Sequence, residues 1–318
     1  MSGAGQVSES ELRSALRSYG LENASVSLCK KQGGFATVFL AQSEDAQYLV
    51  RVRNILATAE QIGFARVWAL AISCEVPVPV AIAGDPIPRI GERLVEVLPY
   101  LPHDHADGGA VGPEAWIRVG EWLGRMHRLG LPLSNHAPSN LPYGNYPTAR
   151  RINDYFQTAQ RTVSGQYNEF FDRSQQLWLE TKRKMTPMLD ALPVGVVHGD
   201  IHFWNVLYTK GMPSAVIDLD FLQQGALIFD VAYACGWLAH WEQNFGPEWN
   251  GIMRRYIEAY QSGRKIPLTE LERLALPWAR IQTSIFFFIQ VASFGWEKTA
   301  GQINDLQKAE DLYSKQQV

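Results

Sequence analysis

Residues 194–221 have the sequence VGVVHGDIHFWNVLYTKGMPSAVIDLDF, and this stretch decides the fold. Its first four residues, Val194–Val197, form a short apolar run, which predicts a buried strand. The strand ends at His198-Gly199-Asp200, so the carboxylate of Asp200 is expected on the loop that follows the strand.

Two further apolar runs, Val206–Tyr208 and Ala215–Ile217, are separated by a Thr-Lys-Gly turn and predict a hairpin. Asn205 comes just before the first of these strands, and Asp218 comes just after the second. The hairpin would therefore bring Asn205 and Asp218 to the same end, with Asp200 on the loop immediately before.

Phosphoryl transfer from a nucleotide needs such a set of groups. One carboxylate orients the acceptor hydroxyl and takes its proton, while an amide and a second carboxylate hold Mg²⁺ against the phosphates. We therefore predict Asp200 as the catalytic residue and Asn205 and Asp218 as ligands of Mg²⁺, which prefers oxygen donors. Protein kinases have the same Asp-to-Asn spacing, but Gly199 stands where they have Arg, and Ile-Asp-Leu-Asp replaces their Asp-Phe-Gly.

The His-Gly-Asp form of this motif resembles the aminoglycoside phosphotransferase and choline kinase superfamily. The beginning of the chain is most similar to homoserine kinase type II, in the segments LRSYGL, QGGFATVFLA and QYLVRV. The resemblance implies an α+β, bilobal protein-kinase-like fold with a small antiparallel-sheet N-lobe and a large, mostly helical C-lobe. We place the nucleotide-binding lobe at residues 1–100 and the catalytic, substrate-binding lobe at residues 101–318. ATP as co-substrate, Mg²⁺ as cofactor and a small-molecule hydroxyl acceptor are implied as well.

The composition is ordinary for a soluble globular protein, with 46% apolar and 19% charged residues among 318. A formal net charge of −3 gives no sign of a nucleic-acid surface or a membrane patch. The three cysteines are far apart, which favours reduced thiols. The N-terminal residues lack a basic-then-apolar pattern, so we expect no signal sequence. The most apolar run, Ile285–Val291, is too short for a bilayer. We expect a cytoplasmic monomer or homodimer without nucleic-acid or membrane partners.

The small lobe is expected to contact the phosphates. Gly33-Gly34 lies between two predicted strands, where paired glycines let backbone N–H groups approach a phosphate, although most such pairs are simple turns. The resemblance places Arg51 where the family has a Lys or Arg that reaches the phosphates. Arg53 points the same way and competes for this role. The alternative for Arg51 is a solvated cation on an edge strand.

Residues 57–73 predict a helix, from which kinases take a Glu that pairs with the strand cation. The expected position falls near Phe64 or Ala65, and neither is acidic. Glu60, about one helical turn earlier, is the candidate substitute. The partner of Arg51 is therefore the point at which this chain departs from the family pattern.

Two more strands are expected at Val78–Ala83 and Arg93–Leu98, and the second ends in a predicted hinge at Glu96-Val97-Leu98. Backbone N–H and C=O groups of this hinge would meet the adenine edge of the nucleotide. An ordinary strand end is the alternative that the sequence leaves open.

Four other polar residues lie near the central motif. By the resemblance, Asp230 braces the catalytic loop from beneath, together with His198. His202 and Asp220 are candidates for contact with the substrate or a second metal ion. For His202 we favour packing or a contact on the phosphate side over proton transfer, and for Asp220 a solvated side chain is the equal alternative.

These observations predict an ATP-dependent small-molecule kinase that transfers the γ-phosphate to a hydroxyl of its acceptor. An amino alcohol such as homoserine, a sugar, and an aminoglycoside or peptide antibiotic are the acceptor classes left open. From residue 201 onward, twelve acidic residues against ten basic ones do not argue for a polycation. A metabolic role and antibiotic resistance are thus both compatible with the sequence.

Two other classes of function fit less well. A protein kinase would need Asp-Phe-Gly and Ala-Pro-Glu segments, and the sequence has neither. A catalytically weak pseudokinase or nucleotide-binding regulator is the non-enzyme alternative. The missing helix glutamate favours it, whereas the presence of Asp200, Asn205 and Asp218 argues against it.

Overall fold

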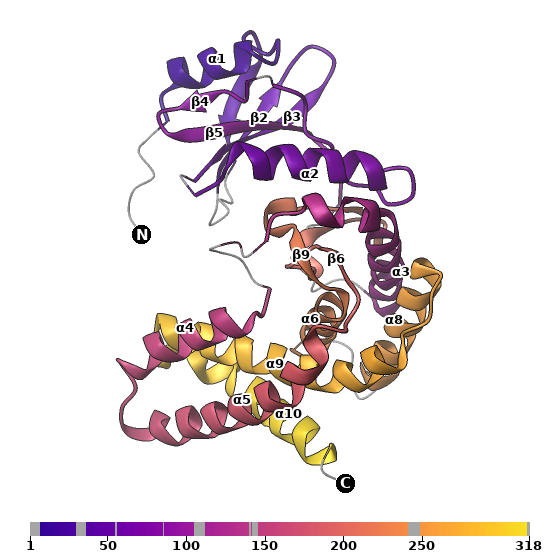
Figure 1. Ribbon diagram of the computed structural model, residues 1–318. Coiled ribbons are helices and arrows are strands. Elements are labelled where there is room, and N and C mark those ends of the chain that lie inside the picture. Colours follow the sequence, from indigo (N-terminus) through magenta and orange to yellow (C-terminus); the bar gives the residue numbers. More distant parts are fainter. Residues whose placement is uncertain are drawn as a thin grey trace.

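The computed structural model describes residues 7–29, 36–54, 56–84, 86–104, 112–139, 141, 146–240 and 249–316. Figure 1 shows a small lobe, built around one sheet, above a large and mostly helical lobe. The predicted α+β class, with a small antiparallel-sheet lobe and a large helical lobe, is thereby confirmed.

The sheet of the small lobe has the strand order β1-β2-β3-β5-β4, and its neighbouring strands are antiparallel. Its strands are β1 (Ser25–Leu28), β2 (Ala36–Gln42), β3 (Gln47–Arg53), β4 (Arg89–Ile90) and β5 (Arg93–Pro99). The expected strand Val78–Ala83 is wrong: this segment lies outside the sheet, and β4 pairs with β5 instead. Pro79 within the segment has no N–H to donate to a strand ladder, and one bond, from Ile82 N–H to Val97 O at 2.8 Å, joins it to β5.

Helix α1 (Glu9–Arg17) packs on this sheet. Its N-terminus has a capping box, because Ser8 Oγ accepts from the N–H of Glu11 and the Glu11 carboxylate accepts from the N–H of Ser8. Leu12 and Leu16 point inward from the helix. The core of the small lobe combines them with apolar residues of the sheet, including Val50, Val52, Val95 and Val97.

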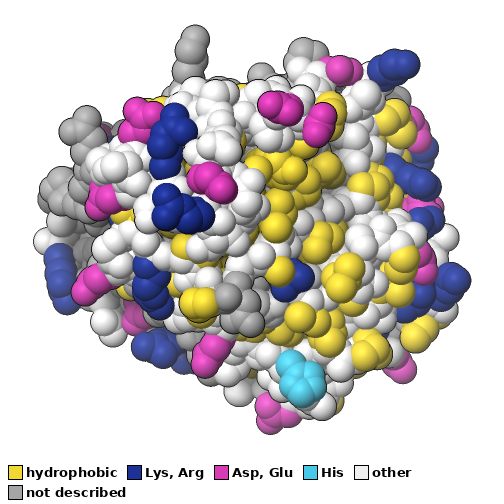
Figure 2. Space-filling view, turned by 90° about the horizontal axis from the view of Figure 1, so that it is seen from above, with side chains coloured by type: hydrophobic (Ala, Val, Ile, Leu, Met, Phe, Trp, Pro, Cys, Tyr) yellow, Lys and Arg dark blue, Asp and Glu magenta, His cyan; other side chains and the backbone are white. Residues whose placement is uncertain are grey.

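Helix α2 (Ala59–Ile72) lies between the sheet and the large lobe (Figure 1). Trp68 and Ile72 are fully buried and belong to the core of the large lobe, so α2 joins the two lobes. Val67 and Leu70, on its other face, are exposed. Seen from above, hydrophobic side chains gather from the middle of the face toward the right, and charged side chains lie over the left half and along the rim (Figure 2).

The large lobe is built from long helices and short 3₁₀ turns. The helices are α3 (Pro113–Gly130), α4 (Ala149–Gln160), α5 (Asn168–Leu189), α6 (Leu227–His240), α8 (Trp249–Arg264), α9 (Glu270–Phe294) and α10 (Ile303–Lys315). The 3₁₀ turns are η2 (Leu131–His136), η3 (Gly165–Tyr167), η4 (Phe203–Asn205), η5 (Leu219–Phe221) and η7 (Trp296–Gly301). Helices α3 and α8 make backbone contact: a Cβ atom at Gly124 would lie 2.1 Å from the carbonyl oxygen of Tyr260.

Helix α9 is long and apolar enough to cross a membrane by length and composition alone. However, 67% of its most apolar window is buried inside the protein. Phe286 and Phe288 of this helix are fully buried in the core of the large lobe. We therefore interpret α9 as a core helix.

Two small two-stranded sheets surround the central motif. The predicted hairpin is confirmed: β7 (Val206–Thr209) pairs with β8 (Met212–Val216). The predicted strand β6 (Val194–Val197) pairs with β9 (Gln223–Ala226), which the sequence analysis missed. The Gln-Gln-Gly-Ala sequence of β9 has little intrinsic strand preference, so its conformation comes from pairing with β6.

A substitution of Gly199 would test how tightly the loop after β6 is packed. Its φ is +77°, and a Cβ atom there would lie 2.7 Å from the carbonyl oxygen of Phe221. We expect Gly199→Ala to lower the free energy of unfolding, measured with urea, by about 1–3 kcal/mol from the left-handed backbone alone. Gly63→Ala is the control, because a Cβ atom there has nothing within 4 Å and alanine favours the helix. Equal stability of the two variants would contradict this account.

Candidate active site

The loop between β6 and η4 is held by Asp230, which lies in the first turn of α6. Its carboxylate accepts the N–H of His198 at 2.6 Å and the N–H of Gly199 at 3.0 Å. Nε2 of the buried His127 lies 3.2 Å from the same carboxylate. Because Asp230 is fully buried, these bonds replace its hydration, and they give it the geometry expected of a brace under the loop.

The side chain of His198 ties the same loop to the end of β8. Its Nε2 donates to the carbonyl oxygen of Ile217 at 3.2 Å. Burial lowers the pKa of His198, so the ring is neutral at physiological pH. The bond holds the residue after Ile217, Asp218, close to the loop that presents Asp200.

Side chains of Tyr233, Asn205 and His202 lie against the carboxylate of Asp200. The Tyr233 hydroxyl donates to Oδ1 at 2.7 Å, and the amide nitrogen of Asn205 donates to Oδ2 at 3.0 Å. Nε2 of His202 lies 3.4 Å from Oδ1. The Nδ1 atom of His202 accepts the N–H of Trp204, so the ring proton is on Nε2 and faces Asp200. These donors orient the carboxylate and stabilise its charge.

Asn205 and Asp218 lie together at one end of the β7–β8 hairpin, where Ile217 N–H bonds to Asn205 O at 2.9 Å. The amide nitrogen of Asn205 makes both bonds to Asp200, at 2.8 Å to its backbone oxygen and 3.0 Å to Oδ2. The amide oxygen is therefore the atom that would ligate a cation. Asp218 has left-handed backbone angles, φ 61° and ψ 65°, a strained conformation that is common at functional sites.

The oxygen donors of Asn205 and Asp218 suit Mg²⁺, which usually takes few protein ligands and completes its shell with water and phosphates. Burial, together with the charge of Asp220, raises the pKa of Asp218 to about 7, and a bound cation would offset this excess of negative charge. No three His, Cys, Asp or Glu side chains within the described ranges come together to hold an ion. The residues present therefore fit an ion held by two side chains and by substrate phosphates.

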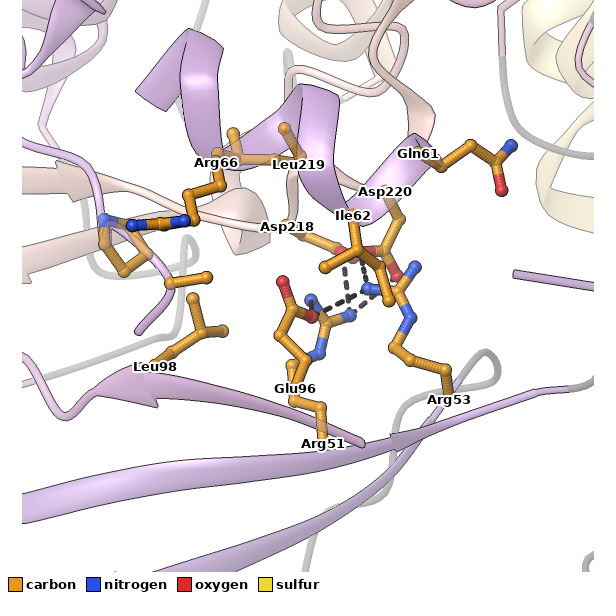
Figure 3. A pocket seen from close by; sticks show the side chains of 13 residues that line it. Arg51, Arg53, Gln61, Ile62, Arg66, Glu96, Leu98, Asp218, Leu219 and Asp220 are labelled. Carbon is orange, nitrogen blue, oxygen red and sulfur yellow. Dashed lines mark hydrogen bonds and ion pairs between the residues drawn. The ribbon is translucent and has the colours of Figure 1, made fainter. Parts of the chain in front are cut away.

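Facing these groups, four charged side chains form a closed ring of ion pairs (Figure 3), and all but the partly exposed Arg51 are buried. Asp220 accepts from Arg51 Nη2 and from Arg53 Nη1, each at 2.6 Å. Glu96 Oε2 lies 3.0 Å from Arg53 Nη1 and 3.5 Å from Arg51 Nη1. Arg51 Nη2 also lies 3.3 Å from Oδ1 of Asp218, so the ring is joined to the candidate metal site. We call Arg51, Arg53, Glu96 and Asp220 the charge ring.

The charge ring changes two expectations about acidic residues. Asp220 is not solvated: burial alone would raise its pKa, but the charges of Arg51 and Arg53 outweigh burial and lower it. Both its oxygens face arginines, which argues against a second metal ion there. Glu60 is exposed at the start of α2, and the ion pairs of Arg51 go to other residues. The prediction that Glu60 pairs with Arg51 is therefore wrong. Glu96 on β5 lies close to Arg51 instead.

The three residues predicted as a hinge lie within a strand. Glu96, Val97 and Leu98 all lie within β5, which continues to Pro99. The carbonyl oxygen of Val97 already accepts from Ile82 N–H, and its side chain is buried in the small-lobe core. The chain therefore leaves the sheet only after Pro99. The expected phosphate loop, Gly33-Gly34, lies outside the described residues.

A small cleft, partly open to solvent, adjoins the charge ring. It lies between β3, β5, α2 and η5, and Figure 3 shows Arg51, Arg53 and Glu96 pointing from the sheet toward Asp218 and Asp220. Its other lining residues are Gln61, Ile62, Ala65, Arg66, Pro79, Ala81, Leu98 and Leu219. The cleft therefore connects the small lobe with the end of the hairpin.

Tyr233 is a site residue that the sequence analysis missed. Burial and the neighbouring Asp200 raise the pKa of Tyr233 well above its usual value, so the phenol keeps its proton and acts as a donor. Tyr233 follows Asp230 by three residues on α6, so both side chains lie on one face of the helix. This spacing was the available signal, but it has meaning only once Asp230 is known to lie beneath the loop.

The fold and the site define a phosphotransferase of the protein-kinase-like type. A family model described as "phosphotransferase enzyme family" matches residues 29–266, and the chain belongs to this family. A curated relative, homoserine kinase from Beijerinckia indica subsp. indica, is 24% identical over 278 residues, which cover 85% of this chain and 81% of the relative. The family match thus places the chain among the phosphotransferases.

Solved structures agree in fold. Amicoumacin kinase in complex with AMP-PNP and Ca²⁺ has a TM-score of 0.66 at 14% identity, over 96% of both chains. The microcompartment-associated aminopropanol kinase has a TM-score of 0.66 at 16% identity, over 95% of both chains. Together with the family match, these likenesses confirm the resemblance to the aminoglycoside phosphotransferase and choline kinase superfamily.

The brace can be tested with Asp230→Asn, which places an amide N–H₂ or a neutral oxygen against two backbone N–H groups. We expect the free energy of unfolding to fall by about 2–4 kcal/mol, since hydrogen bonds to charged groups contribute about 1.5–3 kcal/mol each. Turnover should fall by about 100-fold, because the loop of Asp200 moves. Asp190→Asn, at an exposed position at the end of α5, is the control. A variant as stable and active as this control would show that Asp230 does not brace the loop.

Proposed function

We propose that this protein is an ATP-dependent small-molecule kinase that transfers the γ-phosphate of ATP to a hydroxyl group of a small acceptor. The observation that carries the proposal is a chain of contacts around the hairpin end. Asn205 bonds to Asp200 and to Ile217, the residue before Asp218, and Asp218 lines the cleft and lies 3.3 Å from Arg51. In this proposal, residues 1–100 bind the nucleotide, and residues 101–318 carry catalysis and the acceptor site.

Each of these side chains has a role in the proposed reaction. Asp200, oriented by Tyr233 and Asn205, accepts a hydrogen bond from the acceptor hydroxyl and takes its proton late in the transfer. Asn205 and Asp218 would hold Mg²⁺, which neutralises phosphate charge when bound. Arg51 would steady the phosphates, as its guanidinium has several N–H donors. Rate enhancement then comes from positioning and charge stabilisation.

The chain around Asp200 also suggests where the acceptor binds. His202, Trp204 and Trp237 form an aromatic cluster, with ring centroids 5.0 to 5.6 Å apart. His202 connects this cluster to Asp200, and Trp204 is 38% exposed. We propose that the acceptor lies against Trp204, with its hydroxyl toward Asp200. An amino alcohol such as homoserine is the first candidate, because a homoserine kinase is among the curated relatives.

A nucleotide-binding regulator is the second candidate function. The absence of a helix glutamate near Ala65 favours it, and it predicts binding of Mg-ATP without turnover. A cytoplasmic location belongs to either proposal.

The decisive experiment measures ADP release from Mg-ATP with a panel of hydroxyl acceptors. The panel contains homoserine, choline, hexosamines, methylthioribose, aminoglycosides and cyclic peptide antibiotics. We expect one acceptor to stimulate ADP release, and we expect Asp200→Asn to reduce that rate by about 100-fold or more, since a positioned general base contributes about 10²–10⁴-fold.

Trp204→Ala should raise the KM of the acceptor and leave the KM of ATP unchanged.

Other outcomes separate the two candidate functions. Binding of Mg-ATP, seen as a higher melting temperature, without stimulation by any acceptor would favour the regulator. No binding of Mg-ATP would show that the assignment of Asn205 and Asp218 is wrong.

A further inference from the structure

In the small lobe, the buried carboxylate of Glu96 lies beside Arg51. Glu96 is on a strand, whereas kinases carry the corresponding glutamate on a helix. On α2, the residue that faces the cleft at the place expected for a helix glutamate is Ala65. On β5, Glu96 is the register partner of Arg51 on β3. Paired residues of neighbouring antiparallel strands point to the same side of a sheet, so both side chains face the cleft (Figure 3).

The contacts of Glu96 make it more than a packing residue. Its side chain is 7% exposed, and Oε2 lies 3.5 Å from Arg51 and 3.0 Å from Arg53. Glu96 thus stands between two arginines that also share Asp220. Without Glu96, the buried Arg53 and the partly buried Arg51 would share Asp220 and the partly exposed Asp218 alone. A buried charge without a matched partner is costly.

We infer that Glu96 is the positioning residue that holds Arg51 for the phosphates, in place of the glutamate that kinases carry on the helix after this strand. The inference rests on the proposed function, because it assigns a role within nucleotide binding. Glu96 acts through Arg51 and is not itself a catalytic residue.

The location of Glu96 has a mechanical consequence. In kinases with a helix glutamate, the ion pair forms only when the helix is in place. Here Arg51 and Glu96 lie on hydrogen-bonded strands of one sheet, so the strand register fixes their separation. Displacement of α2 would leave this pair intact, and the position of Arg51 would depend on the sheet and on Asp220.

The first test is Glu96→Gln, which keeps the size of the side chain and removes its charge. We expect the dissociation constant of Mg-ATP, measured by isothermal titration calorimetry, to rise by about tenfold. Glu60→Gln is the matched control, since Glu60 is exposed on α2, and it should change the constant by less than about twofold. A Glu96→Gln variant that binds Mg-ATP as tightly as the Glu60→Gln control would overturn the inference.

The second test moves the charge back to the helix. Ala65 lines the same cleft as Arg51 and Glu96, so the double variant Ala65→Glu/Glu96→Gln restores a carboxylate near Arg51. We expect its Mg-ATP dissociation constant to return to within about threefold of wild type. Ala65→Gln/Glu96→Gln has the same bulk without the charge and should remain weak. A purely structural role for Glu96 predicts that both double variants bind equally, and this result would overturn the inference.

The same set of variants also includes a control for loss of folding. Where Glu96→Gln alone does not fold, the two double variants are compared with each other, because they differ only in the charge at residue 65. A failure of the proposed function is distinguishable: the wild-type protein would then not bind Mg-ATP at all, and the inference would fall with it. Binding by wild type and equally tight binding by the charge-free variants would overturn the inference alone.

Discussion

Matching of buried charge in the charge ring constrains the whole site. Arg51, Arg53 and Glu96 come from the sheet of the small lobe, and Asp220 comes from η5 of the large lobe. Charges in the interior need close partners, because they have lost their hydration. If the lobes separated at this point, Asp220 would lose both arginines, and each arginine would lose Asp220. The ring therefore links the position of Arg51 to the position of the hairpin.

A further buried carboxylate, that of Asp230, holds the loop that presents Asp200. Asp230 takes two backbone N–H groups that the sharp turn at Gly199 leaves without strand partners. On the other side, the neutral ring of His198 bonds to the end of β8. The loop is thus held by α6 and by the hairpin, and Asp200 is further oriented by Tyr233. Site residues supported in this way lie on rigid elements, which transition-state positioning requires.

The partner of Arg51 shows both the use and the limit of a family pattern. The pattern expects a glutamate on the helix near Phe64 or Ala65, and the sequence has none there. It then favoured Glu60, because it assumes that the partner comes from the helix. Strand pairing places Glu96 opposite Arg51 instead, so the function of the pair is kept while its position in the chain changes. Low identity to the relatives, such as 24% for a homoserine kinase, makes such exchanges expected.

The sequence alone determined the elements whose signals are local. Apolar runs predicted β6, β7 and β8, and the spacing from Asp200 to Asn205 and Asp218 predicted that these groups meet. Tertiary structure decided what depends on partners distant in the chain. Strand β9 forms because β6 provides its hydrogen-bonding partners. Asp220 is buried because Arg51 and Arg53 pair with its charge. Glu96 faces the cleft because the β3–β5 register pairs it with Arg51. A residue's neighbours along the chain carry its propensity, whereas its charge partners and its burial are set only when distant segments pack together.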